Sequence, residues 1–329
     1  MSDLAEFSSL LQFRQQFASF SLKKAQKRLE IERNNKVVKD SHMFAAVGSV
    51  FCDSRLPMGI CMDDLNNNIV VAGWSNEVSV WNMQGVKVSS HQNHLDKVQC
   101  VNVLNGLILS GGFDNKIFIS GPDPIKFDGH EGRVNSVKWL ALNEYFVSCS
   151  HDMTWKLWSV EKRKCIQSQE GHGRGIYSLS VHPDQSLIAS ADLSGIAALW
   201  DLRTGKHIQT LKSHNKKILA CEFAPNGYLL STGSEDNTIK IWDIRKKSLM
   251  YTIPAHTKLI SSLSLSQSSI VSGSYDGLVK VWKIQDFSLV QTLTHNSKVT
   301  DVCFDESGDI LVSSSFDRTF KVWTAFRMN

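Results

Sequence analysis

The sequence has no paired-cysteine motif, no secretory leader and no apolar run of membrane length. Its cysteines are odd in number and scattered, without a Cys-x-x-Cys pair that could begin a zinc site or a redox motif: Cys52, Cys61, Cys100, Cys149, Cys165, Cys221 and Cys303. The first residues, MSDLAEFSSLLQF, lack a basic region followed by an apolar one, and no stretch of 18 apolar residues occurs. These absences predict a soluble protein of a reducing intracellular compartment.

Enzyme signatures are missing as well. The chain contains no glycine-rich phosphate loop, no His-Glu-x-x-His motif and no cluster of metal-ligand residues. Its net charge of +4 and pI near 8.6 are compatible with an RNA-associated protein but far from the charge of an autonomous nucleic-acid binder. We therefore expect no catalytic residues, no cofactor and no metal ion.

The sequence does contain an internal repeat. The segments SHDMTWKLWSV, SEDNTIKIWDI, SYDGLVKVWKI and SFDRTFKVWTA share a serine, a turn aspartate and a tryptophan six residues later. If Ser120 takes the place of tryptophan after Asp114, seven landmarks follow at spacings of 39, 38, 42, 42, 40 and 41 residues: Trp81, Ser120, Trp158, Trp200, Trp242, Trp282 and Trp323. Seven repeats of about 40 residues match the WD40 period.

The residues between these landmarks predict short strands. Apolar and polar residues alternate, and turn residues separate the alternating runs. A small sheet cannot bury both of its faces alone, whereas four-stranded blades stacked in a ring can. The sequence thus predicts an all-β, seven-bladed WD40 β-propeller over residues 43–329. MFAAVGSVFC (43–52) is expected as its closing strand, beside the strand that carries Trp323.

Four repeats contain a histidine, a hydroxyl residue, an aspartate and a tryptophan in register. These sets resemble serine hydrolase triads, but a catalytic site occurs once and these recur at equal spacing. We interpret them as structural relays that satisfy a buried indole and a buried imidazole. Ser194 and Ser75 are taken to stand at the turn position in two of the other repeats. The four sets are His130, Ser148, Asp152, Trp158; His214, Thr232, Asp236, Trp242; His256, Ser272, Asp276, Trp282; and His295, Ser313, Asp317, Trp323.

The loops that follow the histidines are rich in cations. Six repeats contribute at least one, against only Asp96 and Glu131, so a positive rim is expected around one end of the central channel. It would suit an acidic peptide or an RNA backbone, and the alternative is a set of solvated loops. The cations are Lys97, Arg133, Arg174, Lys216, Lys217, Lys258 and Lys298.

Residues 1–42 predict a helical extension outside the propeller. Leu10, Phe13, Phe17 and Phe20 have helical spacing, and Ser21 is expected to cap a second helix. In that second helix an apolar stripe is expected to dock on the propeller and a basic face to look outward. The stripe is Leu22, Ala25 and Leu29, and the candidates for RNA contact are Lys23, Lys24, Lys27 and Arg28. The alternative is a packing helix with solvated lysines.

Several segments resemble one family, the WD40 subunit of the spliceosomal U4/U6 small nuclear ribonucleoprotein, known as pre-mRNA-processing factor 4. They are FSLKKAQKRLEIER (20–33), AGWSNEVSVWN (72–82), SHDMTWKLWSVEKRKCIQSQEGHGRGIYSLS (150–180), ALWDLRTGKHIQTLKSHNKKI and IKIWDIRKKSL. The resemblance spans roughly residues 20–323. A short basic helix joined to a Trp-Ser first repeat and an SHDMTWKLW repeat is more particular than WD40 repeats alone.

The resemblance implies a nuclear, non-catalytic scaffold of the U4/U6 particle and of the U4/U6·U5 tri-snRNP in pre-mRNA splicing. It implies binding to a pre-mRNA-processing factor 3-like protein and association with other tri-snRNP proteins and U4/U6 snRNA, directly or through the particle. In some members a cyclophilin docks on an extended N-terminal region. No such region precedes residue 1 here, so a cyclophilin partner is not expected.

Two other functions remain open. Trp200-Asp201-Leu202-Arg203 and Trp242-Asp243-Ile244-Arg245 resemble the Trp-Asp-x-Arg boxes of propellers that act as substrate receptors of cullin-RING ubiquitin ligases. The boxes also arise readily within this repeat, where the arginine can pair with the turn. The third reading is a WD40 interaction hub of another complex.

Overall fold

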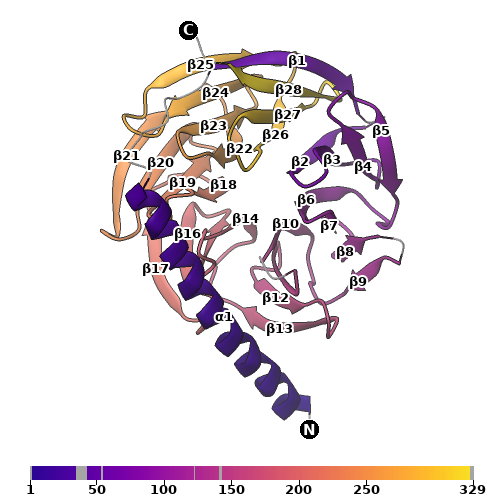
Figure 1. The fold of residues 1–329 in the computed structure, drawn as a ribbon, viewed down its shortest axis with the longest axis vertical. Coiled ribbons are helices and arrows are strands. Elements are labelled where there is room, and N and C mark those ends of the chain that lie inside the picture. Colours follow the sequence, from indigo (N-terminus) through magenta and orange to yellow (C-terminus); the bar gives the residue numbers. More distant parts are fainter. Residues whose placement is uncertain (1, 35–42, 53–54, 122, 141–142, 327–329) are drawn as a thin grey trace.

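The computed structural model describes residues 2–34, 43–52, 55–121, 123–140 and 143–326. These residues form seven four-stranded antiparallel sheets arranged as blades around a central axis, with one long helix beside them (Figure 1). The predicted fold class, a seven-bladed β-propeller with an N-terminal helical extension, is confirmed.

Six blades consist of four strands consecutive in the chain, numbered here from the first repeat. Blade 1 contains β2 (Pro57–Asp63), β3 (Asn68–Gly73), β4 (Val78–Asn82) and β5 (Lys87–His91). Blade 2 contains β6 (Val98–Leu104), β7 (Leu107–Gly112), β8 (Ile117–Ser120) and β9 (Ile125–Phe127). Blade 3 contains β10 (Val134–Trp139), β11 (Tyr145–Ser150), β12 (Trp155–Ser159) and β13 (Lys164–Gln169).

The next three blades follow the same order. Blade 4 contains β14 (Ile176–Val181), β15 (Leu187–Asp192), β16 (Ile196–Asp201) and β17 (His207–Lys212). Blade 5 contains β18 (Ile218–Phe223), β19 (Leu229–Ser234), β20 (Thr238–Asp243) and β21 (Ser248–Pro254). Blade 6 contains β22 (Ile260–Leu265), β23 (Ser269–Ser274), β24 (Leu278–Lys283) and β25 (Leu289–Thr294).

Blade 7 joins the two ends of the propeller sequence. Its three inner strands are β26 (Val299–Phe304), β27 (Ile310–Ser315) and β28 (Thr319–Phe326), and its outer strand is β1 (Met43–Phe51). β1 runs antiparallel to β28, with Ala46 opposite Trp323. Gln291 of blade 6 also holds β1, because its side chain accepts a hydrogen bond from the Phe44 amide and donates one to the Phe44 carbonyl. The strand that precedes the first repeat therefore completes blade 7 to four strands and joins the two ends of the ring.

The core lies between neighbouring blades. One cluster combines Ile60 and Trp81 of blade 1 with Val312 and Phe320 of blade 7, and similar clusters fill the other junctions. In the middle strands both faces are buried, since each blade is covered on two sides. Apolar burial of this kind drives the stacking, and it requires the closed ring.

The N-terminal segment is one continuous helix, α1 (Ser2–Asn34). The prediction of two helices separated at Ser21 was wrong. Ser21 lies mid-helix and is 4% exposed, so its hydroxyl caps no helix start. Residues 18–24 contain neither glycine nor proline, and serine lowers helix stability only slightly, so nothing breaks the helix there. The expected boundary at residue 42 lies outside the described residues.

Candidate interaction site on the loop face

The repeated geometry of the blades defines two faces of the propeller. One face carries the loops that enter the first strand of each blade and the turns between its second and third strands. We call this the loop face, and the other the turn face. The histidines lie in the first set of loops and the turn aspartates in the second, so all relays gather on the loop face.

Three of the four relays expected from the sequence are fully formed. In blade 3, His130 Nδ1 lies 2.7 Å from an Asp152 oxygen and His130 Nε2 lies 2.7 Å from Ser148 Oγ. Trp158 Nε1 donates to the same Oγ at 2.7 Å. Blades 5 and 6 repeat this arrangement with corresponding distances between 2.8 and 3.0 Å.

The relay of blade 7 is looser at one point. His295 Nε2 and Trp323 Nε1 both reach Ser313 Oγ, at 2.7 and 2.8 Å. His295 Nδ1, however, lies 3.9 Å from the nearest Asp317 oxygen, too far for a hydrogen bond. Within the described residues this buried nitrogen has no partner.

The structure contains a further complete relay, in blade 4, that the sequence interpretation missed. His172 lies 3.0 Å from Asp192 and 2.7 Å from Ser190, and Trp200 donates to Ser190 at 2.7 Å. Ser194, taken as the turn residue, instead donates to Asp192 at 2.6 Å. Aspartate and serine have exchanged positions along the turn while the carboxylate keeps its place in space.

Blade 2 has the relay without its tryptophan. His94 contacts Asp114 at 3.0 Å and Ser110 at 2.9 Å, and the Phe118 ring packs edge-on against the imidazole. Ser120 lies where tryptophan is found in the other blades and accepts a hydrogen bond from Asn93. In blade 1 Trp81 donates to Ser79 at 2.8 Å instead.

Burial shifts the pKa of three of the relay histidines, and hydrogen bonding shifts that of Asp152. Burial lowers the pKa of His130 and His256 despite the adjacent carboxylates, and it lowers the pKa of His295 to about 4. Burial alone would raise the pKa of Asp152, but hydrogen bonds from His130 and Thr154 outweigh it and hold that pKa below its usual range. With Nδ1 as the donor to the aspartate, the neutral imidazole fixes the orientation of the turn.

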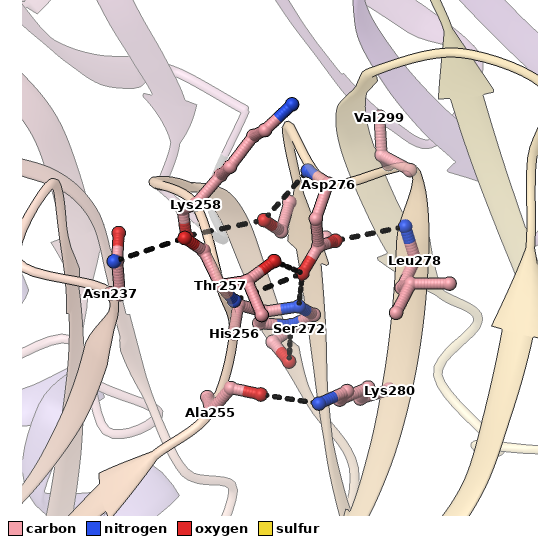
Figure 2. A network of polar contacts seen from close by, with 12 residues as sticks. Asn237, Ala255, His256, Thr257, Lys258, Ser272, Asp276, Leu278, Lys280 and Val299 are labelled. Atoms are coloured by element: carbon pink, nitrogen blue, oxygen red, sulfur yellow. Dashed lines mark hydrogen bonds and ion pairs between the residues drawn. The ribbon is translucent and has the colours of Figure 1, made fainter.

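Lysine and asparagine side chains add links that the sequence analysis did not identify. Two residues before the tryptophan, Lys280 donates to the Ala255 carbonyl at 2.6 Å, and Asn237 of the preceding turn donates to the Thr257 carbonyl at 3.2 Å (Figure 2). Lys156 and Lys321 make the same bond in their blades. The Lys-x-Trp pattern occurs in four repeats and was the available sequence signal for this lysine–carbonyl hydrogen bond.

The seven rim cations lie in the expected loops, but their surroundings differ. Arg174, Lys216 and Lys258 are exposed, and Figure 2 shows the Lys258 side chain pointing away from the relay. Lys217 lies 3.8 Å from Glu235. The remaining three lie over aromatic rings: Lys97, Arg133 and Lys298.

α1 lies on the turn face. Phe13 and Phe17 are completely buried against blades 3 and 4, and Arg14 donates to the Thr204 carbonyl at 3.0 Å. Arg28 forms a two-pronged ion pair with Asp184, at 2.9 and 2.8 Å.

The predicted orientation of this helix was wrong. The stripe expected to dock faces solvent, with Leu22 58% exposed and Leu29 43% exposed. The face with Phe17, Lys24 and Arg28 packs on the propeller, since these positions continue the aromatic spacing at steps of three and four. Burial lowers the pKa of Lys24, although Asp184 and Glu306 oppose the shift. Of the four candidate RNA-contact residues, only Lys23 and Lys27 are exposed.

Both Trp-Asp-x-Arg boxes end in turns of the turn face, and each arginine contacts its own aspartate. Arg203 Nε lies 3.4 Å from Asp201, and an Arg245 nitrogen lies 3.4 Å from Asp243. Arg245 also covers the Tyr228 ring at 4.2 Å.

The first strands surround a cavity of about 480 Å³ along the axis. Lys138 and Glu222 face each other in it at 3.7 Å, and this carboxylate raises the pKa of Lys138. Asp301 accepts hydrogen bonds from the Ile60 amide at 2.8 Å and from Ser262 at 2.5 Å, so it ties blade 7 to both neighbours.

The described part of the chain contains no group of three or more His, Cys, Asp or Glu side chains that could hold a metal ion. Within the same residues, no helix is both long and apolar enough to cross a membrane.

Comparison with known proteins identifies the repeat. The model of the WD domain, G-beta repeat (WD40) matches residues 123–159, 163–201, 205–243, 247–283 and 287–324. Human and mouse striatin-4 are each 33% identical over 57 residues, which is 16% of this chain. The chain matches only 8% of the length of these relatives.

Proposed function

This chain belongs to the WD40-repeat family, and on that premise we propose that it is a non-catalytic interaction scaffold of the spliceosomal U4/U6 small nuclear ribonucleoprotein. It would act in the nucleus within the U4/U6 particle and the U4/U6·U5 tri-snRNP. Its principal partner would be a pre-mRNA-processing factor 3-like protein, with U4/U6 snRNA as part of the same particle.

The scaffold role is supported by how the polar residues are used. The sets of histidine, hydroxyl residue and aspartate, the one feature that resembles catalytic machinery, recur in six blades, where they connect loops and turns. Large loop and turn faces remain around this rigid frame, and binding sites are commonly placed on loops held by such frames.

The splicing assignment is carried by the segment FSLKKAQKRLEIER. It belongs to the resemblance described above, and in this chain it is part of the folded unit, since Arg28 within it pairs with Asp184 of blade 4. A basic helix fixed on a propeller in this way is more particular than the repeats alone.

Affinity purification of the tagged full chain from its own cells, with sequencing of bound RNA and identification of bound proteins, tests the proposal. Recovery of U4 and U6 RNA with a factor 3-like protein would support it. Their absence under conditions that preserve other small nuclear ribonucleoproteins would disprove it, and recovery of cullin-ligase subunits would favour the receptor alternative. The contacts of Arg203 and Arg245 with their own turns instead favour a structural role for those arginines.

A further inference from the structure

One position on the loop face lies seven residues before the blade tryptophan, or before Ser120 in blade 2, and it occurs in every blade. Four adjacent blades, 6, 7, 1 and 2, carry a tyrosine, phenylalanine or tryptophan there, whereas blades 3, 4 and 5 carry His151, Leu193 and Glu235. The four are Tyr275, Phe316, Trp74 and Phe113. Because β1 closes the ring, blades 7 and 1 are neighbours and the four positions form a continuous arc.

Each pair of rings has a lysine between its members. The Phe113 amide donates to the Lys97 carbonyl at 2.9 Å and the Phe316 amide to the Lys298 carbonyl at 2.8 Å, which fixes each cation beside its turn. Lys97 Nζ lies 4.1 Å from the centre of the Trp74 ring and 5.7 Å from that of Phe113. Lys298 lies in the same way between Tyr275 and Phe316, at 5.2 and 5.6 Å.

Arg133 extends this aromatic-cation arc to blade 3, with its guanidinium 5.2 Å from the centre of the Phe113 ring. The rings hold each cation in a defined position, so little side-chain entropy remains to be lost when an anion binds. We use the name aromatic-cation arc for the four rings together with Lys298, Lys97 and Arg133.

The arc has hydrogen-bond donors without acceptors. Among the described residues, Lys97, Arg133 and Lys298 form no ion pair, and Trp74 Nε1 and Arg133 Nε are buried without a partner. The acid nearest in sequence, Asp96, accepts a bond from the Lys97 amide. Unpaired buried donors are unfavourable, so a ligand that brings carboxylates or carbonyls would be stabilised here. In blade 5, by contrast, Lys217 already forms an ion pair with Glu235.

A peptide fits this surface better than a nucleic acid. Single-stranded RNA binds on open aromatic faces, but these rings are only partly exposed and already carry cations over their faces. Separate cations, one at each blade, instead match side-chain carboxylates spaced along an extended chain, whose carbonyls can accept from the remaining donors.

We propose that the aromatic-cation arc binds an extended acidic segment of a partner protein, with its carboxylates on Lys298, Lys97 and Arg133. This inference rests on the proposed scaffold role and assigns it a partner chemistry and a place. The helix α1 lies on the opposite face, so both faces could be engaged at once.

Fluorescence anisotropy of the purified full chain tests the arc. The probe is a fluorescein-labelled peptide in which glutamate alternates with serine, and its uncharged counterpart has glutamine in place of glutamate. Lys97→Glu/Lys298→Glu reverses two cations of the arc. Lys162→Glu/Lys246→Glu reverses two exposed cations of the turn face and is the charge-matched control.

The glutamate peptide should bind and the glutamine peptide should not. The arc variant should weaken binding about tenfold or more, while the control changes it by less than about twofold. Trp74→Phe, which removes one donor and keeps a ring, should weaken it about threefold. Thermal unfolding of each variant establishes that it is folded.

Three results would overturn the proposal: no binding of the glutamate peptide to the folded wild-type chain, equal weakening in both double variants, or tighter arc-dependent binding of a single-stranded RNA of equal charge. The anisotropy assay uses only the purified chain and the peptide, so its result does not depend on assembly into the U4/U6 particle. A chain that binds the peptide but recovers no U4 or U6 RNA from cells therefore contradicts the splicing assignment alone, and the converse result contradicts the arc alone.

Discussion

His295 Nδ1 and Asp317 Oδ2 are 3.9 Å apart, whereas the equivalent atoms in the other relays are 2.7 to 3.0 Å apart. The imidazole is buried with that nitrogen unpaired, and burial lowers its pKa to about 4. Blade 7 also contains the closing strand, so the loosest relay lies where the ring is joined.

The pH dependence of stability should reflect this histidine. In the unfolded chain His295 takes up a proton near pH 6.5, but in the folded chain only near pH 4. Protons therefore favour the unfolded state in this window, and stability falls as the pH drops from about 6.5 to 4. In His295→Gln the urea midpoint should fall less steeply across that window, after normalisation at pH 8. An unchanged slope would contradict the lowered pKa.

Asp192 should matter more to stability than Ser194. Asp192→Ala leaves His172 without its carboxylate and removes the acceptor of the turn, at an expected cost of about 2 kcal/mol in unfolding free energy. Ser194→Ala removes one hydroxyl donor and should cost less than about 1 kcal/mol. Urea denaturation of both variants measures the difference. Equal losses, or the reverse order, would restore Ser194 as the turn residue.

Arg28 should hold the C-terminal half of α1 on the propeller. Arg28→Ala leaves the Asp184 carboxylate, which is 8% exposed, without its partner, so local docking should weaken by about 2 kcal/mol. Hydrogen exchange of residues 20–30 should then accelerate. Lys27→Ala, next to it and exposed, is the control and should leave exchange unchanged. Equally fast exchange in both variants would contradict a specific role for Arg28, because alanine does not lower helix propensity.

The aromatic side of α1 gives a larger effect. Phe17→Ala removes a fully buried ring stacked on Phe13 at 4.8 Å and should cost about 3 kcal/mol of docking free energy. Leu22→Ala on the solvent side should cost less than about 0.5 kcal/mol. The rate of limited proteolysis within α1 measures the loss of docking in both variants. If Leu22→Ala exposed the helix to cleavage as strongly as Phe17→Ala, the orientation described here would be incorrect.

Met153 offers a stabilising substitution. It has a φ of 68°, a left-handed conformation that most side chains resist, at the position where Asn237 has the same φ and bonds to the next blade's loop. Met153→Asn should raise the unfolding free energy by about 0.5 to 1 kcal/mol, whereas Met153→Ala should not. Thermal melts of the two variants decide it, and a lower melting temperature for the asparagine variant would refute the strain argument.

Repetition explains what the sequence could reveal. The relay of blade 5 was predictable because His214, Asp236 and Trp242 keep spacings found in other repeats. Asp192 escaped because the aspartate was sought six residues before tryptophan. Its distance of 20 residues from His172 equals that from His94 to Asp114 and was the available signal.

α1 occurs once, so no second copy could correct its interpretation. The Leu22 stripe was periodic, but periodicity alone could not say which of two apolar faces meets the propeller. That choice depends on Asp184, which lies far away in sequence and attracts Arg28. The aromatic-cation arc was likewise only partly visible: Lys97 and Lys298 were predicted at the rim, but their rings come from neighbouring turns that only the closed ring brings beside them.

The closing strand has a consequence for synthesis on the ribosome. β1 precedes all the other strands of the ring in the chain, and its partner β28 is the last strand of the ring. Until β28 has been synthesised, β1 therefore has no strand to pair with. A product that stops before Thr319 leaves that strand permanently single and the junction cluster around Phe320 unfilled. Such shortened products should unfold more readily than the full ring, because they lack the closing strand pair and part of the apolar core between blades 7 and 1.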